Sequence, residues 1–394
     1  MHSSYHDLLR VQSIEKVTLE FTTRCNLKCT YCAVTRPWHR KNDLDLSEFD
    51  TLITEMKTLG VQLVQISGGG ETTIVKDWDQ YLSKLIDHGF RVSIITNLAK
   101  PLTAHAVRAL SRCSEITTSI DTVRPELYEA IRKGGDFETF AHNILRIRAQ
   151  CAIENRKTPY LIWNAVANDQ IIGLVDEWVA MGVALGVDHF QISEMAKYDD
   201  LPGWISVNPV GTMSSEALAL ARIAVDRARQ IAKDSGKVFF ILPAVEEALQ
   251  GSRKMMRTEV ILDTSSEGRP VFKSSRSFTQ IVNVDGTTEE VPTPPPTPVV
   301  PGKTTKNCLL PWTDAFVWAT EDVAPCCFYK RIRPFEAKDL RNALNSEPFI
   351  QIREGLLTGN LSSTCNMCPM FAQIEVAEFQ QRVAERIGSA FVRA

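Results

Sequence analysis

The feature that most constrains the fold is an alternation of two hydrophobic patterns along residues 17–193. Short runs rich in β-branched residues, typical of strands, are separated by longer stretches with apolar residues at helical spacing. Strands that alternate with helices form parallel βα units with right-handed crossovers. Because six units are too few to close an eight-stranded barrel, we expect an α/β fold with a partial (β/α)6 TIM-like barrel. Strands are predicted at 16–21, 62–67, 91–96, 115–120, 160–166 and 188–192, and helices near 46–59, 77–87, 103–112, 125–132, 136–150 and 170–184.

Changes in composition divide the rest of the chain. The proline-rich stretch at 291–301 predicts an extended linker, and cysteines return after it. We therefore expect an N-terminal segment, the barrel, an insertion with helices, a hairpin and the linker, a C-terminal cysteine-rich extension and a final helix. Their predicted boundaries are 1–16, 17–200, 201–304, 305–370 and 371–394.

Charge and hydropathy exclude several classes of protein. The 394 residues carry a net charge of −3 without a basic block, so no nucleic-acid partner is expected. No apolar run reaches membrane-spanning length, and the first residues lack a signal-peptide pattern, which predicts a cytoplasmic protein without a membrane partner. Of the ten cysteines, three lie within 25–32 and five within 308–368. Without an export signal, such clusters indicate metal ligands and not disulfides.

Cys25, Cys29 and Cys32 follow the first predicted strand directly. A short irregular loop lets three thiolates at this spacing converge on one [4Fe–4S] cube, which leaves the fourth iron open for chemistry. One alternative is a structural zinc site with His39 as the fourth ligand, and another is part of a ferredoxin-like cluster. Zinc prefers two Cys-x-x-Cys units and a fourth protein ligand, whereas this loop contains a single such unit, Cys29 to Cys32.

The Cys-x-x-x-Cys-x-x-Cys spacing after strand one of an α/β barrel, with Tyr31 before the last cysteine, resembles the radical S-adenosylmethionine (SAM) superfamily. The resemblance implies that the open iron binds the amino and carboxylate groups of SAM, and that Tyr31 belongs to the cofactor site. It implies that the reduced cluster cleaves SAM to methionine and a 5′-deoxyadenosyl radical, which abstracts a substrate hydrogen. An electron donor such as flavodoxin or ferredoxin is expected, and the protein supplies orientation.

A glycine-rich motif ends the second predicted strand. Residues 67–71 read Ser-Gly-Gly-Gly-Glu, and glycines at a strand end allow close backbone approach to a ligand. The motif resembles the family's Gly-Gly-Glu, which implies that Gly69, Gly70 and Glu71 lie at the amino group of SAM. Thr72 stands where the family usually has proline, and an ordinary glycine turn is the alternative.

Two further strand ends resemble family motifs. Residues 118–121 read Thr-Ser-Ile-Asp, which implies that Ser119 and Asp121 lie near the ribose hydroxyls or the carboxylate of SAM. The alternative for Asp121 is a helix N-cap. Asn97 closes an Ile-Thr-Asn segment and is also a candidate for cofactor binding, although Leu98 follows where glycine is usual.

The sixth predicted strand leads into Ser193 and Glu194. Barrel chemistry gathers at the C-terminal ends of strands, so Ser193 is a candidate for cofactor binding and Glu194 a candidate catalytic base. The alternative for Glu194 is a solvated loop position. Asn164 in the fifth strand could point into the barrel, but alternation alone does not say which face it takes.

The second cysteine set consists of Cys308, Cys326 or Cys327, Cys365 and Cys368. Four thiolates fit either a fully ligated [4Fe–4S] cluster or a zinc site with four cysteine ligands. The surrounding segments resemble the SPASM/Twitch auxiliary-cluster extension, and the absence of cysteines after Cys368 fits the shorter Twitch form with one auxiliary [4Fe–4S] cluster. Cys326 gives the favoured spacing.

The motifs do not identify the substrate. Twitch enzymes include the aminocyclitol dehydrogenase that oxidises 2-deoxy-scyllo-inosamine, so the leading hypothesis is hydrogen abstraction from a polar small molecule, sugar or aminocyclitol-like, giving oxidation or rearrangement. The alternative is modification of a precursor peptide by crosslinking or epimerisation, which related SPASM-type proteins perform. A hypothesis of another class is a non-catalytic iron–sulfur or zinc scaffold.

Overall fold

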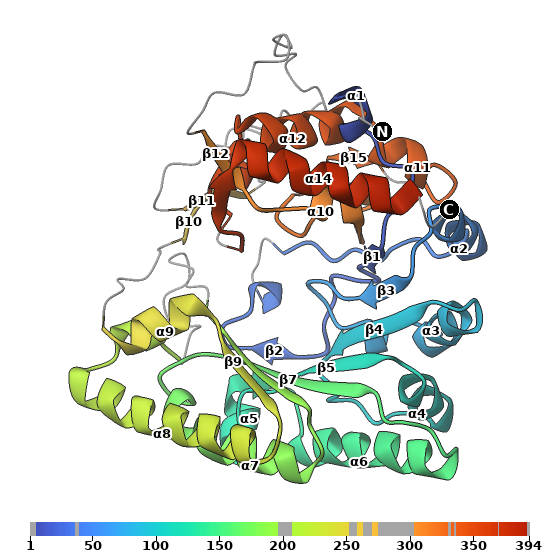
Figure 1. Ribbon diagram of the computed structural model, residues 1–394. Coiled ribbons are helices and arrows are strands. Elements are labelled where there is room, and N and C mark those ends of the chain that lie inside the picture. The colour runs from blue at the N-terminus through green and yellow to red at the C-terminus, as the bar shows by residue number, and fades with distance from the viewer. Residues whose placement is uncertain are drawn as a thin grey trace.

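The computed structural model of this protein is built on one large central sheet with helices around it (Figure 1). No helix in the described part of the chain is both long and apolar enough to cross a membrane. The structure describes residues 5–35, 39–195, 207–251, 258–262, 270–274, 303–329, 332–334, 336–368 and 370–391.

All six predicted barrel strands are present, and each pairs with its neighbours in parallel. The helices predicted between them are present as well, so the expected partial TIM-like barrel is confirmed. The strands are β1 (Lys16–Leu19), β3 (Leu63–Ile66), β4 (Arg91–Thr96), β5 (Glu115–Ser119), β7 (Tyr160–Val166) and β8 (His189–Ser193). The helices are α2 (Phe49–Thr58), α3 (Trp78–Asp87), α4 (Ala104–Ser111), α5 (Pro125–Ile131), α6 (Phe137–Ile153) and α7 (Val175–Ala184).

Both edges of the sheet are extended by segments expected outside the barrel. Beyond β8, the strand β9 (Val238–Ile241) adds in parallel, and α8 (Ser215–Asp234) packs on α7. Beyond β1, β13 (Asp314–Trp318) adds in parallel, followed by the antiparallel β14 (Asp322–Ala324) and β15 (Arg333–Pro334). The resulting order is β15-β14-β13-β1-β3-β4-β5-β7-β8-β9, so one sheet joins the barrel to the cysteine-rich extension.

The N-terminal segment packs on the C-terminal extension. The Val11 N–H donates to Oδ1 of Asn345 at 2.8 Å, and the Trp312 indole donates to the Leu8 carbonyl at 2.6 Å. Figure 1 accordingly shows α1 (Tyr5–Leu8) beside the last helices. The helices of the extension are α10 (Leu310–Thr313), α11 (Leu340–Leu344), α12 (Glu347–Thr358), α13 (Ser363–Asn366) and α14 (Val376–Phe391).

The remaining elements are short. The strand β12 (Thr304–Lys306) pairs with β16 (Gln373–Glu375), and β10 (Thr258–Leu262) pairs with β11 (Pro270–Ser274), as expected for a hairpin in the insertion. The predicted proline-rich linker lies outside the described residues. The helix α9 (Pro243–Leu249) follows β9, and the single turns are η1 (Ala33–Thr35), η2 (Thr72–Ile74), η3 (Ile172–Leu174) and η4 (Val210–Thr212).

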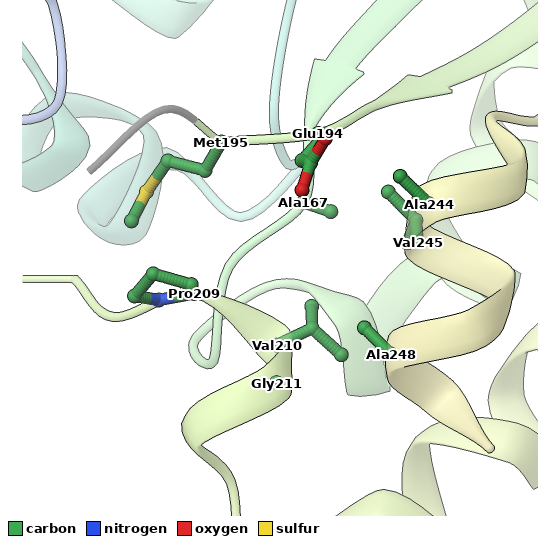
Figure 2. Close-up of a pocket in the computed structure, with 9 residues that line it drawn as sticks. All are labelled: Ala167, Glu194, Met195, Pro209, Val210, Gly211, Ala244, Val245 and Ala248. Atoms are coloured by element: carbon green, nitrogen blue, oxygen red, sulfur yellow. The ribbon is translucent and has the colours of Figure 1, made fainter. Parts of the chain in front are cut away.

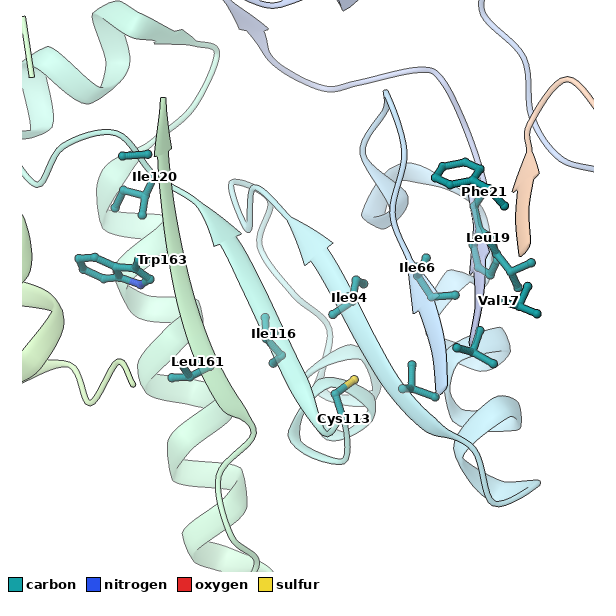
Figure 3. Close-up of a cluster of buried hydrophobic side chains, with 14 of the residues drawn as sticks. Val17, Leu19, Phe21, Ile66, Ile94, Cys113, Ile116, Ile120, Leu161 and Trp163 are labelled. Atoms are coloured by element: carbon teal, nitrogen blue, oxygen red, sulfur yellow. The ribbon is translucent and has the colours of Figure 1, made fainter. Parts of the chain in front are cut away.

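The two faces of the parallel sheet differ in burial. On the outer face, Ile66, Ile94, Ile116 and Trp163 are wholly buried beneath the helices (Figure 3). The Trp163 ring, for example, lies 5.9 Å from that of Trp178 in α7. Because successive residues of a strand point to opposite faces, the half-exposed positions of β5, β7 and β8 lie together on the inner face. The inner face is therefore the side of the barrel that a ligand can reach.

Candidate functional site

The first cysteine loop follows β1 and is held by short backbone contacts. The Cys32 N–H donates to the Cys29 carbonyl at 3.1 Å, and the Leu27 N–H donates to Sγ of Cys25 at 3.4 Å. Cys29 lies in β2 (Lys28–Cys29), which pairs with β6 (Arg132–Lys133) so that Cys29 stands opposite Arg132. Cys29 is buried, and Cys25 and Cys32 are half-buried. The three thiols are therefore only partly accessible to solvent.

The charges around these thiols fit an iron–sulfur cluster. Burial, with a contribution from the neighbouring Cys32, raises the pKa of Cys25 to about 11 and that of Cys29 to about 12, although Arg132 lowers both in part. Because a thiol binds metal as the thiolate, such a group needs nearby positive charge, which bound iron supplies. In the described residues, no three Cys, His, Asp or Glu side chains form a site for a single metal ion.

The glycine-rich loop packs directly against the cysteine loop. A Cβ atom on Gly70 would lie 2.3 Å from the carbonyl oxygen of Arg24, a distance that only glycine allows. The N–H of Glu71 donates to that same carbonyl at 2.7 Å, and the N–H of Gly69 donates to the buried carboxylate of Glu20 at 2.6 Å. The motif is therefore more than an ordinary turn, because its backbone fixes the residue before Cys25.

The carboxylate of Glu71 is buried and stabilises the end of β4 by hydrogen bonds. One oxygen accepts the Thr73 N–H at 3.1 Å and the Thr96 hydroxyl at 2.7 Å, and the other accepts the Asn97 N–H at 2.7 Å. The predicted role of Glu71 at the SAM amino group thus stays a prediction beside this clear structural role.

Asn97 reaches the cysteine loop from the end of β4. Its side-chain amide donates to Oδ1 of Asn26 at 3.0 Å and approaches Sγ of Cys25 at 3.8 Å. Leu98, which follows, has a φ of 48° and a wholly buried side chain. This position therefore keeps the left-handed backbone that glycine favours, even though leucine occupies it.

Tyr31, Asp121 and Arg132 form a buried polar network beside Cys29. The Tyr31 hydroxyl donates to Oδ2 of Asp121 at 2.8 Å, and Nε of Arg132 lies 2.8 Å from the same oxygen. Nη2 of Arg132 donates to the Tyr31 hydroxyl at 2.9 Å, and Nη1 lies 4.0 Å from Sγ of Cys29. Burial lowers the pKa of Arg132, but Asp121, Tyr31 and Cys29 together more than offset this, so the pKa is raised and Arg132 stays charged. No local pattern in the sequence marks Arg132 as part of the site.

A second polar group lies on the inner face, at the ends of β7 and β8. The Ser193 hydroxyl and the Gln191 amide donate to Oδ1 of Asn164, at 2.7 and 3.2 Å. Ser119 stands opposite Asn164 in the pairing of β5 with β7. Asn164 thus takes the inner face, a choice that alternation alone had left open.

Glu194 lies apart from that polar group. It lines a small pocket with Ala167, Val210 and Val245, between the end of β8, η4 and α9 (Figure 2). The rest of the lining is largely apolar. The role of Glu194 as a base therefore stays a prediction, and nothing in this pocket adds to it.

The second cysteine set gathers in the extension. Burial is the main cause that raises the pKa of Cys308 to about 12, and Cys365, Cys326 and Cys368 are near enough to contribute to that rise. Cys327 is exposed, whereas Cys326 is half-buried, which favours Cys326 as the ligand. The hydroxyl of the buried Tyr329 lies 3.2 Å from Sγ of Cys365. The four thiols are therefore neighbours in space although they are far apart along the chain.

Comparison with curated proteins finds relatives over part of the chain. The sequence is 27% identical to a PqqA peptide cyclase of Rhodopseudomonas palustris over 232 residues, 58% of this chain and 58% of that protein. It is 36% identical to a GTP 3′,8-cyclase of Limosilactobacillus fermentum over 130 residues, 30% of this chain and 37% of that protein. The chain thus spans about half the length of the curated relatives it matches.

Solved structures and family models agree on the fold and the domain. SuiB of Streptococcus suis, solved bound to SAM, superimposes with a TM-score of 0.55 at 17% identity, over 91% of this chain and 71% of SuiB. At that identity the likeness shows the fold alone. The family model of the radical SAM superfamily matches residues 19–153, which hold the first cysteine loop, the glycine-rich loop and the network around Arg132. Residues 19–153 of this chain are therefore a radical SAM domain.

Proposed function

We propose that this protein is a radical SAM enzyme that modifies a peptide. The observation that carries the enzyme class is the meeting of the Cys25–Cys32 loop, the glycine-rich loop and the Tyr31–Asp121–Arg132 network within the matched domain. The cluster and SAM, when bound, supply the radical chemistry by which a substrate hydrogen is abstracted. The protein's own part is to hold, orient and shield these groups.

Several side chains divide that work. Cys25, Cys29 and Cys32 would hold the cluster. The Asn97 amide and the Arg132 guanidinium, 3.8 and 4.0 Å from the sulfurs of Cys25 and Cys29, would stabilise the thiolates. On the inner face, Ser119 and Ser193 would contact the cofactor or the substrate.

A peptide is favoured over the sugar or aminocyclitol that the sequence analysis put first. The match to the peptide cyclase extends over 232 residues, against 130 to 179 for the GTP cyclases. The inner face also suits a peptide, because the polar group around Asn164 continues into Val238 and Phe240 of β9, which are 47% and 46% exposed. Amides and hydroxyls can pair with peptide groups, and exposed apolar side chains can pack on peptide side chains.

The second cysteine set would hold one auxiliary [4Fe–4S] cluster through Cys308, Cys326, Cys365 and Cys368. A cluster with four protein ligands has no open iron, so it would accept or relay an electron. Zinc is the alternative occupant, and metal analysis separates the two.

Deuterium transfer tests the enzyme class and the substrate class together. We expect the anaerobically reconstituted protein, with SAM and dithionite, to release 5′-deoxyadenosine. With fully deuterated peptides encoded beside its gene, deuterium should appear in that product by mass spectrometry, because the abstracted hydrogen ends there.

Two variants control the experiment. Cys32→Ala should abolish the release, whereas Cys151→Ala, at a buried thiol that donates to the Ser111 carbonyl, should keep it. Transfer from a deuterated aminocyclitol but from no peptide would overturn the peptide assignment alone. An iron-replete protein that releases no 5′-deoxyadenosine would overturn the enzyme class.

A further inference from the structure

Glu20 is a buried carboxylate that joins two distant parts of the chain. It directly follows β1 and is only 2% exposed. One carboxylate oxygen accepts the N–H of Gly69 at 2.6 Å, and the other accepts the N–H of Ala319 at 3.1 Å. Its partners therefore lie 49 and 299 residues away along the sequence.

The side chain fits beneath the glycine-rich loop because that loop has no side chain there. A Cβ atom on Gly68 would lie 2.3 Å from Cγ and 2.4 Å from Oε1 of Glu20. The backbone of Glu20 is held as well, since its N–H donates to the Val317 carbonyl in β13 at 2.9 Å. Both ends of the residue are thus fixed, and hydrogen bonds to a charged carboxylate are among the stronger kind.

Each partner of Glu20 leads to one cysteine set. On one side, Gly69 is followed by Gly70, whose backbone packs against the Arg24 carbonyl, and by Glu71, whose N–H donates to that carbonyl. On the other side, Ala319 begins the turn between β13 and β14, and β14 ends two residues before Cys326.

We infer that Glu20 is a positioning residue that couples the glycine-rich loop of the radical SAM domain to the cysteine-rich extension. The inference rests on the proposed function only in treating the two loops as cofactor sites. A displacement of the β13–β14 turn changes the position of the Gly69 N–H through this one side chain, and the reverse also holds. The extension thereby takes part in shaping the SAM site without touching SAM.

Hydrogen–deuterium exchange of the whole chain, without SAM, tests the link. Glu20→Ala removes both acceptors, so amide exchange should rise by about tenfold or more in the segments around residues 67–71 and 317–322 together. Glu20→Gln keeps the shape but leaves one acceptor oxygen, so we expect a smaller rise. Asp188→Asn is the control, because the Asp188 carboxylate accepts from Leu161 and Lys237 at the other end of the sheet, away from both segments.

SAM binding to the reconstituted protein is the second measurement. Glu20→Ala should raise the Kd for SAM about tenfold, and the iron content of both cysteine sets should stay unchanged. Faster exchange in only one of the two segments, or the same changes in Asp188→Asn, would overturn the coupling. If Glu20→Ala does not fold, the isosteric Glu20→Gln carries the same test. A wild-type protein that binds no SAM would refute the proposed function and leave the exchange result standing.

Discussion

Arg132 contacts the polar groups of the site from the middle of a buried network. It faces Asp121, Tyr31 and Cys29 at once because β6 pairs with β2. Burial of a guanidinium costs its hydration, and a neighbouring carboxylate offsets that cost; Asp121 is wholly buried beside Arg132. Asp121 also accepts the Val166 N–H at 2.9 Å, so it is fixed from a second strand. The pair thus joins the cysteine loop to β5 and β7.

We predict that Asp121→Asn destabilises the cluster-free protein by about 3–5 kcal/mol, because it leaves Arg132 charged and buried without its anion. Glu177→Gln is the control, since it breaks an ion pair with Arg124 whose side chains are 46% and 50% exposed and which contributes at most about 1 kcal/mol. Thermal and urea unfolding measure both. Equally small decreases in the free energy of unfolding of the two variants would show that the buried pair stabilises the protein no more than the exposed one.

At the scale of elements, packing distances decide how the helices lie on the sheet. The helix α7 approaches β8 so closely that a Cβ atom on Gly182 would lie 2.3 Å from Cε1 of Phe190 and 3.0 Å from the Trp163 ring. The Phe190 ring is held in turn by Trp178 at 5.3 Å. Glycine at this position therefore sets the depth at which the helix packs.

We predict that Gly182→Ala destabilises the fold by about 1–3 kcal/mol, because the aromatic cluster has no free space for a methyl group. Gly173→Ala is the matched control: a Cβ atom there would meet nothing within 4 Å, so the change should be neutral or slightly stabilising. Thermal unfolding compares the two variants. A neutral Gly182→Ala would mean that Phe190 can move aside.

Helix ends show where periodicity is a poor guide. The helix predicted over 46–59 begins only at Phe49. The reason is local: the Asp45 carboxylate accepts the Ser47 N–H at 2.8 Å and holds those residues in a turn. Apolar spacing extends into such turns, so the helix was predicted too long at its start.

At the scale of the molecule, one sheet connects both cysteine sets. The strand β13 pairs with β1 in register from Lys16 with Asp314 to Leu19 with Val317. The cysteine loop follows β1 and Cys326 follows β14, so the sheet fixes both loops. Because the sheet itself positions both loops, we expect each cysteine set to keep its metal when the ligands of the other set are replaced.

We predict about eight irons per reconstituted chain, because two four-iron clusters are expected, and about four after Cys25, Cys29 and Cys32 are replaced by alanine. Replacing Cys308, Cys326, Cys365 and Cys368 should also leave about four. Cys113→Ala, at a buried thiol outside both sets, is the control and should keep all of them. Zinc in the C-terminal set, measured by elemental analysis, would contradict the auxiliary cluster.

Local patterns in the sequence were enough for the alternating strands and helices, the Cys25–Cys32 loop and the glycine-rich loop. Each depends on residues close together along the chain: a strand on its alternation, a chelating loop on its spacing, a tight approach on glycine. This is why the six parallel strands and the radical SAM domain were predicted correctly.

The tertiary structure was needed for the roles of Glu20 and Arg132 and for the inner-face position of Asn164. Each depends on a partner that only strand pairing brings near, such as Ala319, which lies 299 residues from Glu20. A buried charge also looks like any surface charge in the sequence until its surroundings are known. Sequence spacing reports which groups can act together locally, and the fold decides which distant groups meet because burial and pairing act between segments far apart in the chain.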